Sequence, residues 1–157
     1  MVLRMNPSAS VLATSSLSSC SDLAEENTMV GRTLLPVMMR ARTGVLLNVS
    51  SVAAARPTRG QSVYAATKGA VESLTRALAL EYAAKGVRVL CLRPGPVDTD
   101  MLAGTRAIAG AELLARIPLG RVATPAEVAE HAAFLLSDRA AFATGTVHVV
   151  DGGYGLP

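Results

Sequence analysis

The chain has 157 residues, a formal net charge of +3 and an apolar content of 50%, so a single domain with a substantial core is expected. Aromatic residues make up only 3% and Trp is absent, which leaves few platforms for stacking bases and argues against binding of single-stranded nucleic acid. The basic residues are dispersed, and no apolar stretch approaches the roughly 20 residues of a membrane helix. We therefore expect neither a nucleic-acid partner nor a membrane partner.

The two cysteines, Cys20 and Cys91, form no CxxC motif and have no histidine spaced to join them as metal ligands. Neither a disulfide framework nor a metal site is expected, and a reducing compartment such as the cytoplasm fits this usage. Cys91 lies within an apolar run and is interpreted as a small buried hydrophobe.

Residues 1–21 differ from the rest of the chain, with seven Ser, one Arg and no acidic residue. This composition has some likeness to an organelle transit peptide, which would place the protein in an organelle. A disordered tail is the favoured interpretation, because composition alone identifies no targeting signal. The predicted organisation is a Ser-rich tail over 1–21 and one domain over 22–157.

Regular patterns begin at residue 22. A helical segment is predicted over about 22–40, although Gly31 and Pro36 interrupt it. The run "GVLLNVSS", residues 44–51, is apolar and ends in two hydroxyl residues, which predicts a buried strand. Residues 53–61 contain Pro57 and Gly60 and are expected to form a loop.

A long helix is predicted over about 64–84, because apolar residues recur there at steps of three and four: Val71, Leu74, Leu78 and Tyr82. Gly86 supplies a stop signal after it. The run "VRVLCLRPG", residues 87–95, is a second buried strand that ends at a Pro-Gly pair. Strand, helix and strand in this order predict a parallel crossover unit of an α/β sheet.

Residues 98–119 lack a clean period and are interpreted either as a helical lid or as a long surface excursion. Thr124, Pro125 and Glu127 supply an N-cap, a first-turn proline and a capping-box carboxylate, which predict a helix over about 125–137. The final run "GTVHVVDGGYG", residues 145–155, predicts a third strand followed by a glycine-rich turn.

Tyr64 and Lys68 are one helical turn apart, so their side chains share a face. An ammonium beside a phenol favours the phenolate and lowers a tyrosine pKa from its ordinary value of about 10, so such a pair can move protons. If the strand ending at Ser51 lies beside this helix, the Ser51 hydroxyl can hydrogen-bond a substrate oxygen. Taken alone, the pair also fits two ordinary helix positions.

The surrounding motifs are more specific. "NVSS", a tyrosine thirteen positions after Ser51, "YAATKGAVESLTRALALE", "VRVLCLRPGPVDTDM" and "GTVHVVDGGYG" occur in this order. Together they closely resemble the short-chain dehydrogenase/reductase family over residues 34–155, about three-quarters of the chain. The resemblance implies an α/β fold with a Rossmann-like parallel sheet and flanking helices, and NAD or NADP as cofactor.

By this resemblance, Ser51 positions the substrate carbonyl or hydroxyl, and Tyr64 donates the proton in reduction or accepts it in oxidation. Lys68 holds the nicotinamide ribose and depresses the pKa of Tyr64. The segment "PGPVDT" corresponds to the family segment that borders the nicotinamide. The cofactor-binding residues implied are Tyr64, Lys68, Pro94, Gly95, Val97 and Thr99.

The sequence departs from the family pattern in its first part. No TGxxxGxG or GxGxxG turn occurs, so the first βαβ units of the nucleotide-binding half are expected to be missing and the Rossmann-like domain incomplete. The Ser51 strand is then expected to have an unpaired edge. The family's proton-relay Asn has a candidate in Asn27, which lies closer to Pro36 than the pattern leads one to expect.

The implied function is an NAD(P)-dependent oxidoreductase that interconverts a secondary alcohol and a ketone, either a 3-oxoacyl-carrier-protein reductase or a broad carbonyl reductase, working as a homo-oligomer. The alternative is a non-catalytic relative that associates with full-length subunits through its long helix and C-terminal strand. A nucleotide-sugar epimerase or dehydratase shares Tyr-x-x-x-Lys but not the "PGPVDTDM" and "DGGYG" segments, so it ranks last. A fragment of a full enzyme, a chain that folds by pairing and an inactive relic all remain compatible with the sequence.

Overall fold

A three-stranded parallel sheet forms the centre of the molecule. The computed structural model describes residues 2–6, 9–11 and 34–156, with side chains placed for residues 34–100, 102 and 110–156. The strand order is β2-β1-β3-β4-β5, and the bounds are β1 (Val2–Asn6), β2 (Ala9–Val11), β3 (Gly44–Val49), β4 (Val87–Pro94) and β5 (Val147–Val150). Strands β3, β4 and β5 run parallel, and β1 pairs antiparallel with β3. The predicted α/β class is confirmed.

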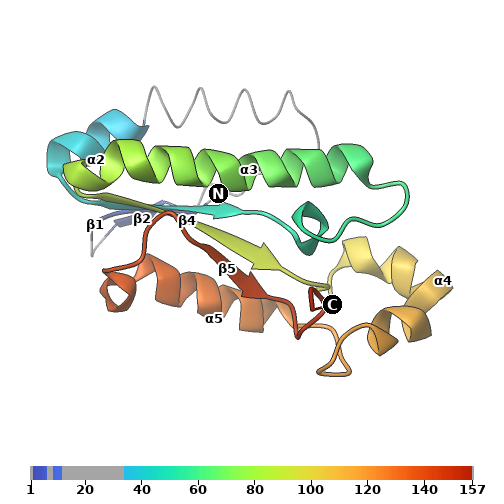
Figure 1. Cartoon of the computed structure of the whole chain (residues 1–157). Coiled ribbons are helices and arrows are strands. Elements are labelled where there is room, and N and C mark those ends of the chain that lie inside the picture. Colours follow the sequence, from blue (N-terminus) through green and yellow to red (C-terminus); the bar gives the residue numbers. More distant parts are fainter. Residues whose placement is uncertain (1, 7–8, 12–33, 157) are drawn as a thin grey trace.

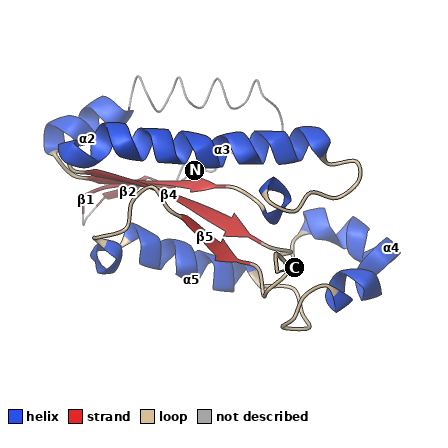
Figure 2. Cartoon of the chain, in the orientation of Figure 1, coloured by secondary structure: helices blue, strands red, loops and turns tan. Residues whose placement is uncertain are grey.

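Helices cover both faces of the sheet, which gives three layers (Figures 1 and 2). Helices α2 (Leu35–Ala41) and α3 (Ser62–Tyr82) lie on one face, and α5 (Pro125–Leu136) lies on the other. Side chains of β3 alternate between the layers: Leu46 packs in the cluster below α2 and α3, and Leu47 packs with Leu135 of α5. Because both faces are covered, the strands are continuous apolar runs.

Helix α3 crosses the sheet and connects β3 to β4. Its buried residues recur at helical spacing and include the predicted Val71 and Leu78, while Leu74 and Tyr82 pack against the core as partly buried residues. The buried face also contains four polar residues that apolar periodicity does not identify: Thr67, Lys68, Glu72 and Thr75. The helix therefore combines a core-packing half with a buried polar half.

The turn after α3 brings the starts of two strands close together. The helix continues into a short 3-10 segment, Ala83–Lys85, and ends at Gly86, as the stop signal predicted. Gly86 has φ +81°, and a Cβ there would lie 2.2 Å from the carbonyl oxygen of Arg42. Glycine is required at this position both by its conformation and by the close approach of the backbone.

Two more helices follow β4. Residues 98–119, which the sequence leaves as a lid or an excursion, contain α4 (Asp100–Ala115), located beyond the carboxyl ends of the strands (Figure 1). The expected capping box at α5 is present, with Thr124 accepting from the backbone of Glu127 and the Glu127 carboxylate accepting from Thr124. No helix in the described ranges is both long and apolar enough to cross a membrane.

The N-terminal strands differ from expectation. The edge of β3, expected to be unpaired, is occupied by β1, with Leu3 opposite Leu46 in an antiparallel register. This pairing satisfies the backbone N–H and C=O groups that an open strand edge would expose. Within the expected disordered tail, residues 2–6 and 9–11 are thus strands, and the rest of that segment lies outside the described residues, as does 22–33 of the first predicted helix.

Candidate active site

The predicted catalytic residues lie where β3 ends and α3 begins. Ser51 is the second residue after β3, and Tyr64 and Lys68 lie in the first two turns of α3. In Figure 1 the start of α3 lies at the same end of the sheet as the carboxyl ends of β3 and β4. This edge of a parallel α/β sheet is where ligands bind in such folds.

Tyr64 and Lys68 are brought together as their spacing predicted. The Lys68 ammonium lies 5.6 Å from the centroid of the Tyr64 ring, within the range of a cation–π contact. It also donates a hydrogen bond to the carbonyl of Val49 at 3.1 Å, so the lysine links α3 to the last residue of β3. Lys68 is only 6% exposed, and its ammonium is therefore held in a defined place beside the phenol ring.

Ser50 and Ser51 have separate roles in the structure. Ser51 has extended backbone (φ −157°, ψ 155°), and its hydroxyl oxygen accepts from the backbone N–H of Ala53 at 3.2 Å, capping the short 3-10 segment Val52–Ala54. Accepting that bond leaves the O–H of Ser51 able to donate. Ser50 is buried, and its hydroxyl lies 2.8 Å from Oε1 of Glu72 and 3.1 Å from the carbonyl of Lys68.

A buried polar network behind the site was not predicted from the sequence. Arg93 of β4 donates from Nε and Nη2 to the two carboxylate oxygens of Glu72, at 2.8 and 2.6 Å. One turn further along α3, Asn48 donates to the hydroxyl of Thr75 at 2.9 Å. The sequence signal for this network is the presence of polar residues at strand and helix positions where the apolar pattern predicts burial.

Ionisation in this network follows from its contacts. Burial opposes charge on Glu72, but hydrogen bonds from Arg93 and Ser50 outweigh it and hold the pKa of that carboxyl below its ordinary value. The hydrogen bond to Glu72 raises the pKa of Arg93. Burial, with the nearby Glu72 charge, raises the pKa of the Cys91 thiol to about 11. The network is therefore an ion pair at neutral pH, and Cys91 is a neutral buried thiol.

The expected residues bordering the nicotinamide begin at Pro94, the last residue of β4. The Gly95 N–H donates to the carbonyl of Val150 at 2.9 Å, and a Cβ on Gly95 would lie 2.6 Å from the Cα of Asp151. Val97 pairs with Ala123 in an isolated parallel bridge, and Thr99 is the residue before α4. The Pro94–Gly95 turn is thus packed against the C-terminal turn. Asn27, the relay candidate, lies outside the described residues.

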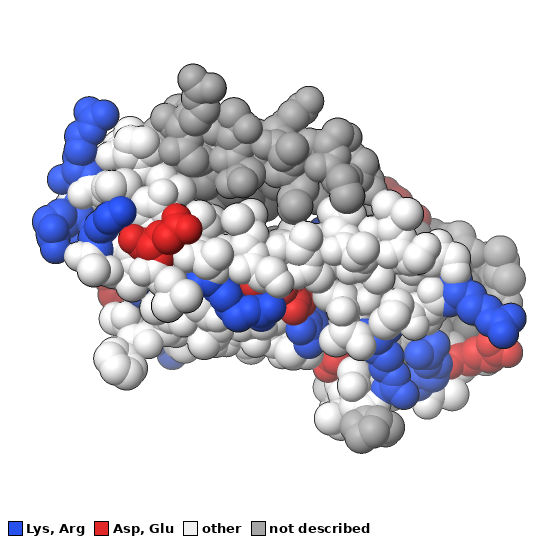
Figure 3. All heavy atoms as spheres, turned by 45° about the horizontal axis from the view of Figure 1, so that its top comes forward, with Lys and Arg blue, Asp and Glu red and all other residues white. Residues whose placement is uncertain are grey.

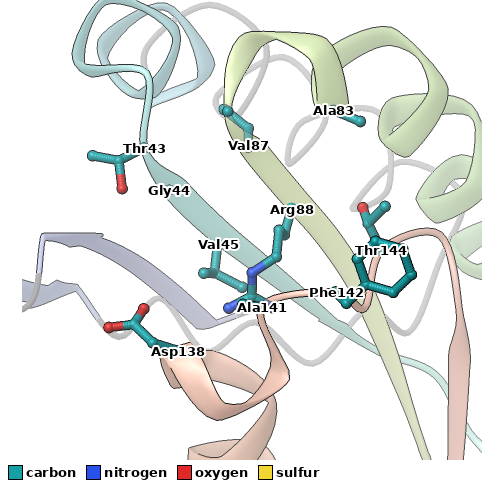
Figure 4. A pocket seen from close by; sticks show the side chains of 11 residues that line it. Thr43, Gly44, Val45, Ala83, Val87, Arg88, Asp138, Ala141, Phe142 and Thr144 are labelled. Atoms are coloured by element: carbon teal, nitrogen blue, oxygen red, sulfur yellow. The ribbon is translucent and has the colours of Figure 1, made fainter.

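Two of the cavities in the described part of the chain adjoin the sheet. One of about 360 Å³ adjoins the Ser51 loop and is lined by Val52, Ala55, Arg93, Val149, Asp151, Gly153, Gly155 and Leu156. The other, of about 740 Å³, lies at the amino ends of β3 and β4, where Figure 4 shows Arg88 and Asp138 among the lining residues. The Arg88 guanidinium donates to the carbonyls of Leu135 and Ser137 there. Neither cavity is lined by Ser51, Tyr64 or Lys68.

Charged side chains on the face shown in Figure 3 are dispersed, with Lys and Arg groups separated by uncharged surface and accompanied by Asp and Glu. This distribution agrees with the absence of basic runs in the sequence.

Comparison with known proteins identifies the family. The sequence family described as Enoyl-(Acyl carrier protein) reductase matches residues 27–155. The chain is 45% identical over 126 residues to cis-4-hydroxycyclohexanecarboxylate dehydrogenase of Sinomonas cyclohexanicum, covering 80% of this chain and 51% of that protein. It is 43% identical over 116 residues to 3-oxoacyl-(acyl-carrier-protein) reductase of Chlamydia muridarum, covering 74% and 47%. The chain thus spans about half the length of these relatives.

Solved structures agree with the sequence comparison. The 3-ketoacyl-(acyl-carrier-protein) reductase of Brucella melitensis, complexed with NADH, matches with a TM-score of 0.76 at 33% identity, covering 92% of this chain and 62% of that one. A protein of Beutenbergia cavernae with NADP at low occupancy matches with a TM-score of 0.79 at 40% identity, covering 83% and 53%. The match over residues 27–155 and the shared fold show that this chain belongs to the short-chain dehydrogenase/reductase family.

Proposed function

We propose that this chain carries the catalytic residues of an NAD(P)-dependent oxidoreductase that interconverts a secondary alcohol and a ketone. The observation that carries the proposal is the position of the Lys68 ammonium, 5.6 Å from the Tyr64 ring centroid and bonded to the carbonyl of Val49. An ammonium fixed beside a phenol stabilises the phenolate that forms when the phenol gives up its proton. Ser51, at the end of the same strand as Val49, completes the site.

Each of the three side chains has a role in carbonyl reduction. The nicotinamide supplies the hydride to the carbonyl carbon when it is bound. Tyr64 donates its phenolic proton to the substrate oxygen, and Ser51 donates a hydrogen bond to that oxygen and orients it. Lys68 stabilises the resulting Tyr64 phenolate by its charge. In alcohol oxidation the proton moves back from the substrate hydroxyl to Tyr64.

The residues present suit one end of the cofactor. Two hydroxyls and an ammonium at the carboxyl ends of parallel strands are donors that suit ribose hydroxyls and a carbonyl oxygen. Lys68 would hold the nicotinamide ribose, and Pro94, Gly95, Val97 and Thr99 would border the nicotinamide. The adenosine and pyrophosphate end has no glycine-rich turn in this sequence.

The substrate class rests on the relatives. One relative is a dehydrogenase of a hydroxycyclohexane carboxylate, and another is a reductase of carrier-bound 3-oxoacyl groups. Both names describe chemistry at a secondary alcohol or its ketone. We therefore propose a secondary alcohol or ketone as substrate, either carrier-bound or small, with NAD or NADP as cofactor.

A second candidate function is association without catalysis. Strand β5 is the last strand of the sheet in the described part of the chain, and Val149 on it is 48% exposed. Leu80 of α3 is 87% exposed. A strand at a sheet edge can pair with another chain, and this position of β5 favours association with another copy or with a full-length relative.

Turnover measured in matched tyrosine variants distinguishes the two functions. Tyr64→Phe is expected to lower the rate of cofactor oxidation with ketone substrates by at least about 100-fold, because it removes the proton donor. Tyr82→Phe is the control, since Tyr82 is also on α3 and also has a lysine ammonium, that of Lys85, 4.6 Å from its ring centroid. Equal rates in wild type and Tyr64→Phe would contradict the proposal. A folded wild-type chain without turnover would favour the association function.

A further inference from the structure

The first half of α3 has three ionisable side chains spaced four residues apart: Tyr64, Lys68 and Glu72. This spacing places them on one face of the helix, each one turn from the next. Lys68 and Glu72 are both only 6% exposed. A carboxylate one turn from an ammonium attracts it, so Glu72 is a competitor for the lysine that the proposed site needs beside Tyr64.

The Glu72 carboxylate is engaged by residues from the two neighbouring strands. Arg93 binds both of its oxygens in a bidentate pair, at 2.8 and 2.6 Å, and Ser50 donates to Oε1 at 2.8 Å. Such a fork is among the strongest and most directional contacts that a carboxylate makes. The carboxylate is thereby held toward β4, which carries Arg93.

Removing Arg93 would leave a buried charge without its main partner. A buried carboxylate that loses its cation is strongly unfavourable and recruits another cation within reach. Two cations lie one turn away on α3, Lys68 toward the start of the helix and Arg76 toward its end. Arg76 is exposed, its guanidinium donates to Ser73, and its charge already helps to lower the pKa of Glu72, whereas Lys68 is buried one turn nearer the start of the helix.

We infer that Arg93 is a positioning residue of the proposed site, acting through Glu72: by holding both carboxylate oxygens, it keeps the Lys68 ammonium beside the ring of Tyr64. The inference rests on the proposed function for its catalytic meaning. The position of the Lys68 ammonium relative to the Tyr64 ring can be measured whether or not the chain is catalytic.

The inference makes a specific prediction for three variants. In Arg93→Met the lysine moves toward the released carboxylate and away from Tyr64. In Glu72→Gln the competitor has lost its charge, so the lysine stays in place. In the double variant Arg93→Met/Glu72→Gln no carboxylate is present to attract the lysine, so its position returns to that of the wild type although two side chains have changed.

The test is the nuclear Overhauser effect between the ε-methylene protons of Lys68 and the ring protons of Tyr64, measured on the full isotope-labelled chain without cofactor or substrate. The same spectrum contains an internal control in Lys85 and Tyr82, which form a similar contact at 4.6 Å in the second half of α3. Circular dichroism establishes that each variant is folded. If Arg93→Met does not fold, Arg93→Gln replaces it in both the single and the double variant.

The expected result is at least a threefold loss of the Lys68–Tyr64 signal in the single arginine variant, recovery in the double variant, and a constant Lys85–Tyr82 signal throughout. An unchanged Lys68–Tyr64 signal in the folded arginine variant would overturn the inference. A loss that persists in the double variant would overturn it too, because Arg93 would then act independently of Glu72. The experiment measures no turnover, so it tests the position of Lys68 even if the proposed catalytic function proves wrong.

Discussion

The hydroxyl of Ser50 lies 2.8 Å from Oε1 of Glu72, and this contact joins the end of β3 to the helix that carries Tyr64 and Lys68. Because Ser50 is the direct neighbour of Ser51, the contact fixes the chain segment that carries the hydroxyl proposed to orient the substrate. The same carboxylate binds Arg93 of β4. One buried acid therefore ties together the three elements that form the candidate site.

Stability should fall in acid partly because of Glu72. Hydrogen bonds from Arg93 and Ser50 lower its pKa below the ordinary 4.5 despite burial, so its contribution is complete above about pH 4.5 and is lost as pH falls toward the folded-state pKa. Glu127 adds only a weaker dependence: hydrogen bonds from Arg121 and Thr124 lower its pKa to about 2, but this ion pair is exposed and screened by solvent. Urea unfolding of Glu72→Gln should show a shallower loss of unfolding free energy below about pH 4.5 than the wild type, with the Glu127 part remaining. Identical slopes would exclude Glu72 as a source of acid sensitivity.

Two glycines should respond oppositely to alanine. A Cβ at Gly95 would lie 2.6 Å from the Cα of Asp151, so Gly95→Ala should lower the free energy of unfolding by about 1–3 kcal/mol through overpacking. Gly69 lies inside α3, and a Cβ added there would meet no atom of the described residues within 4 Å beyond its own stretch of helix, so Gly69→Ala should raise it by about 0.5–1 kcal/mol. Chemical denaturation measures both. A neutral Gly95→Ala would mean that the Pro94–Gly95 turn does not pack against the C-terminal turn.

The Cys91 thiol should be inert in the folded chain. It is fully buried, and burial raises its pKa to about 11, so the reactive thiolate is scarce at neutral pH. In a Cys20→Ser background, a thiol-specific reagent at pH 8 should label Cys91 at least about 100-fold more slowly than in urea, because labelling requires opening of the core. Rapid labelling of a chain that circular dichroism shows to be folded would contradict the burial of β4.

Much of the fold follows from local patterns. Strands β3 and β4 and helices α3 and α5 appear close to their expected bounds, because apolar periodicity, glycine stops and the capping box are local signals. Tyr64 and Lys68 meet because their spacing alone sets the helix face that they share.

Other features depend on contacts between distant residues. Arg93 and Glu72 are 21 positions apart, and each looks like an ordinary polar residue until α3 is placed on β4. The strand that pairs with the edge of β3 comes from a Ser-rich segment whose composition resembles a tail. Neither relationship has a local sequence signal, because each arises only when the sheet is assembled.

The most direct test of the central claim is a calorimetric titration of the folded 157-residue chain with NADPH and with NADH, up to millimolar concentration. Lys68→Met is the test variant and Lys85→Met the matched control, since both lysines contact a tyrosine ring on or just after α3. We predict saturable binding of at least one of the two cofactors, weakened at least about tenfold by Lys68→Met and unchanged by Lys85→Met. A folded wild-type chain that binds neither cofactor, or that binds equally well without Lys68, would contradict the account.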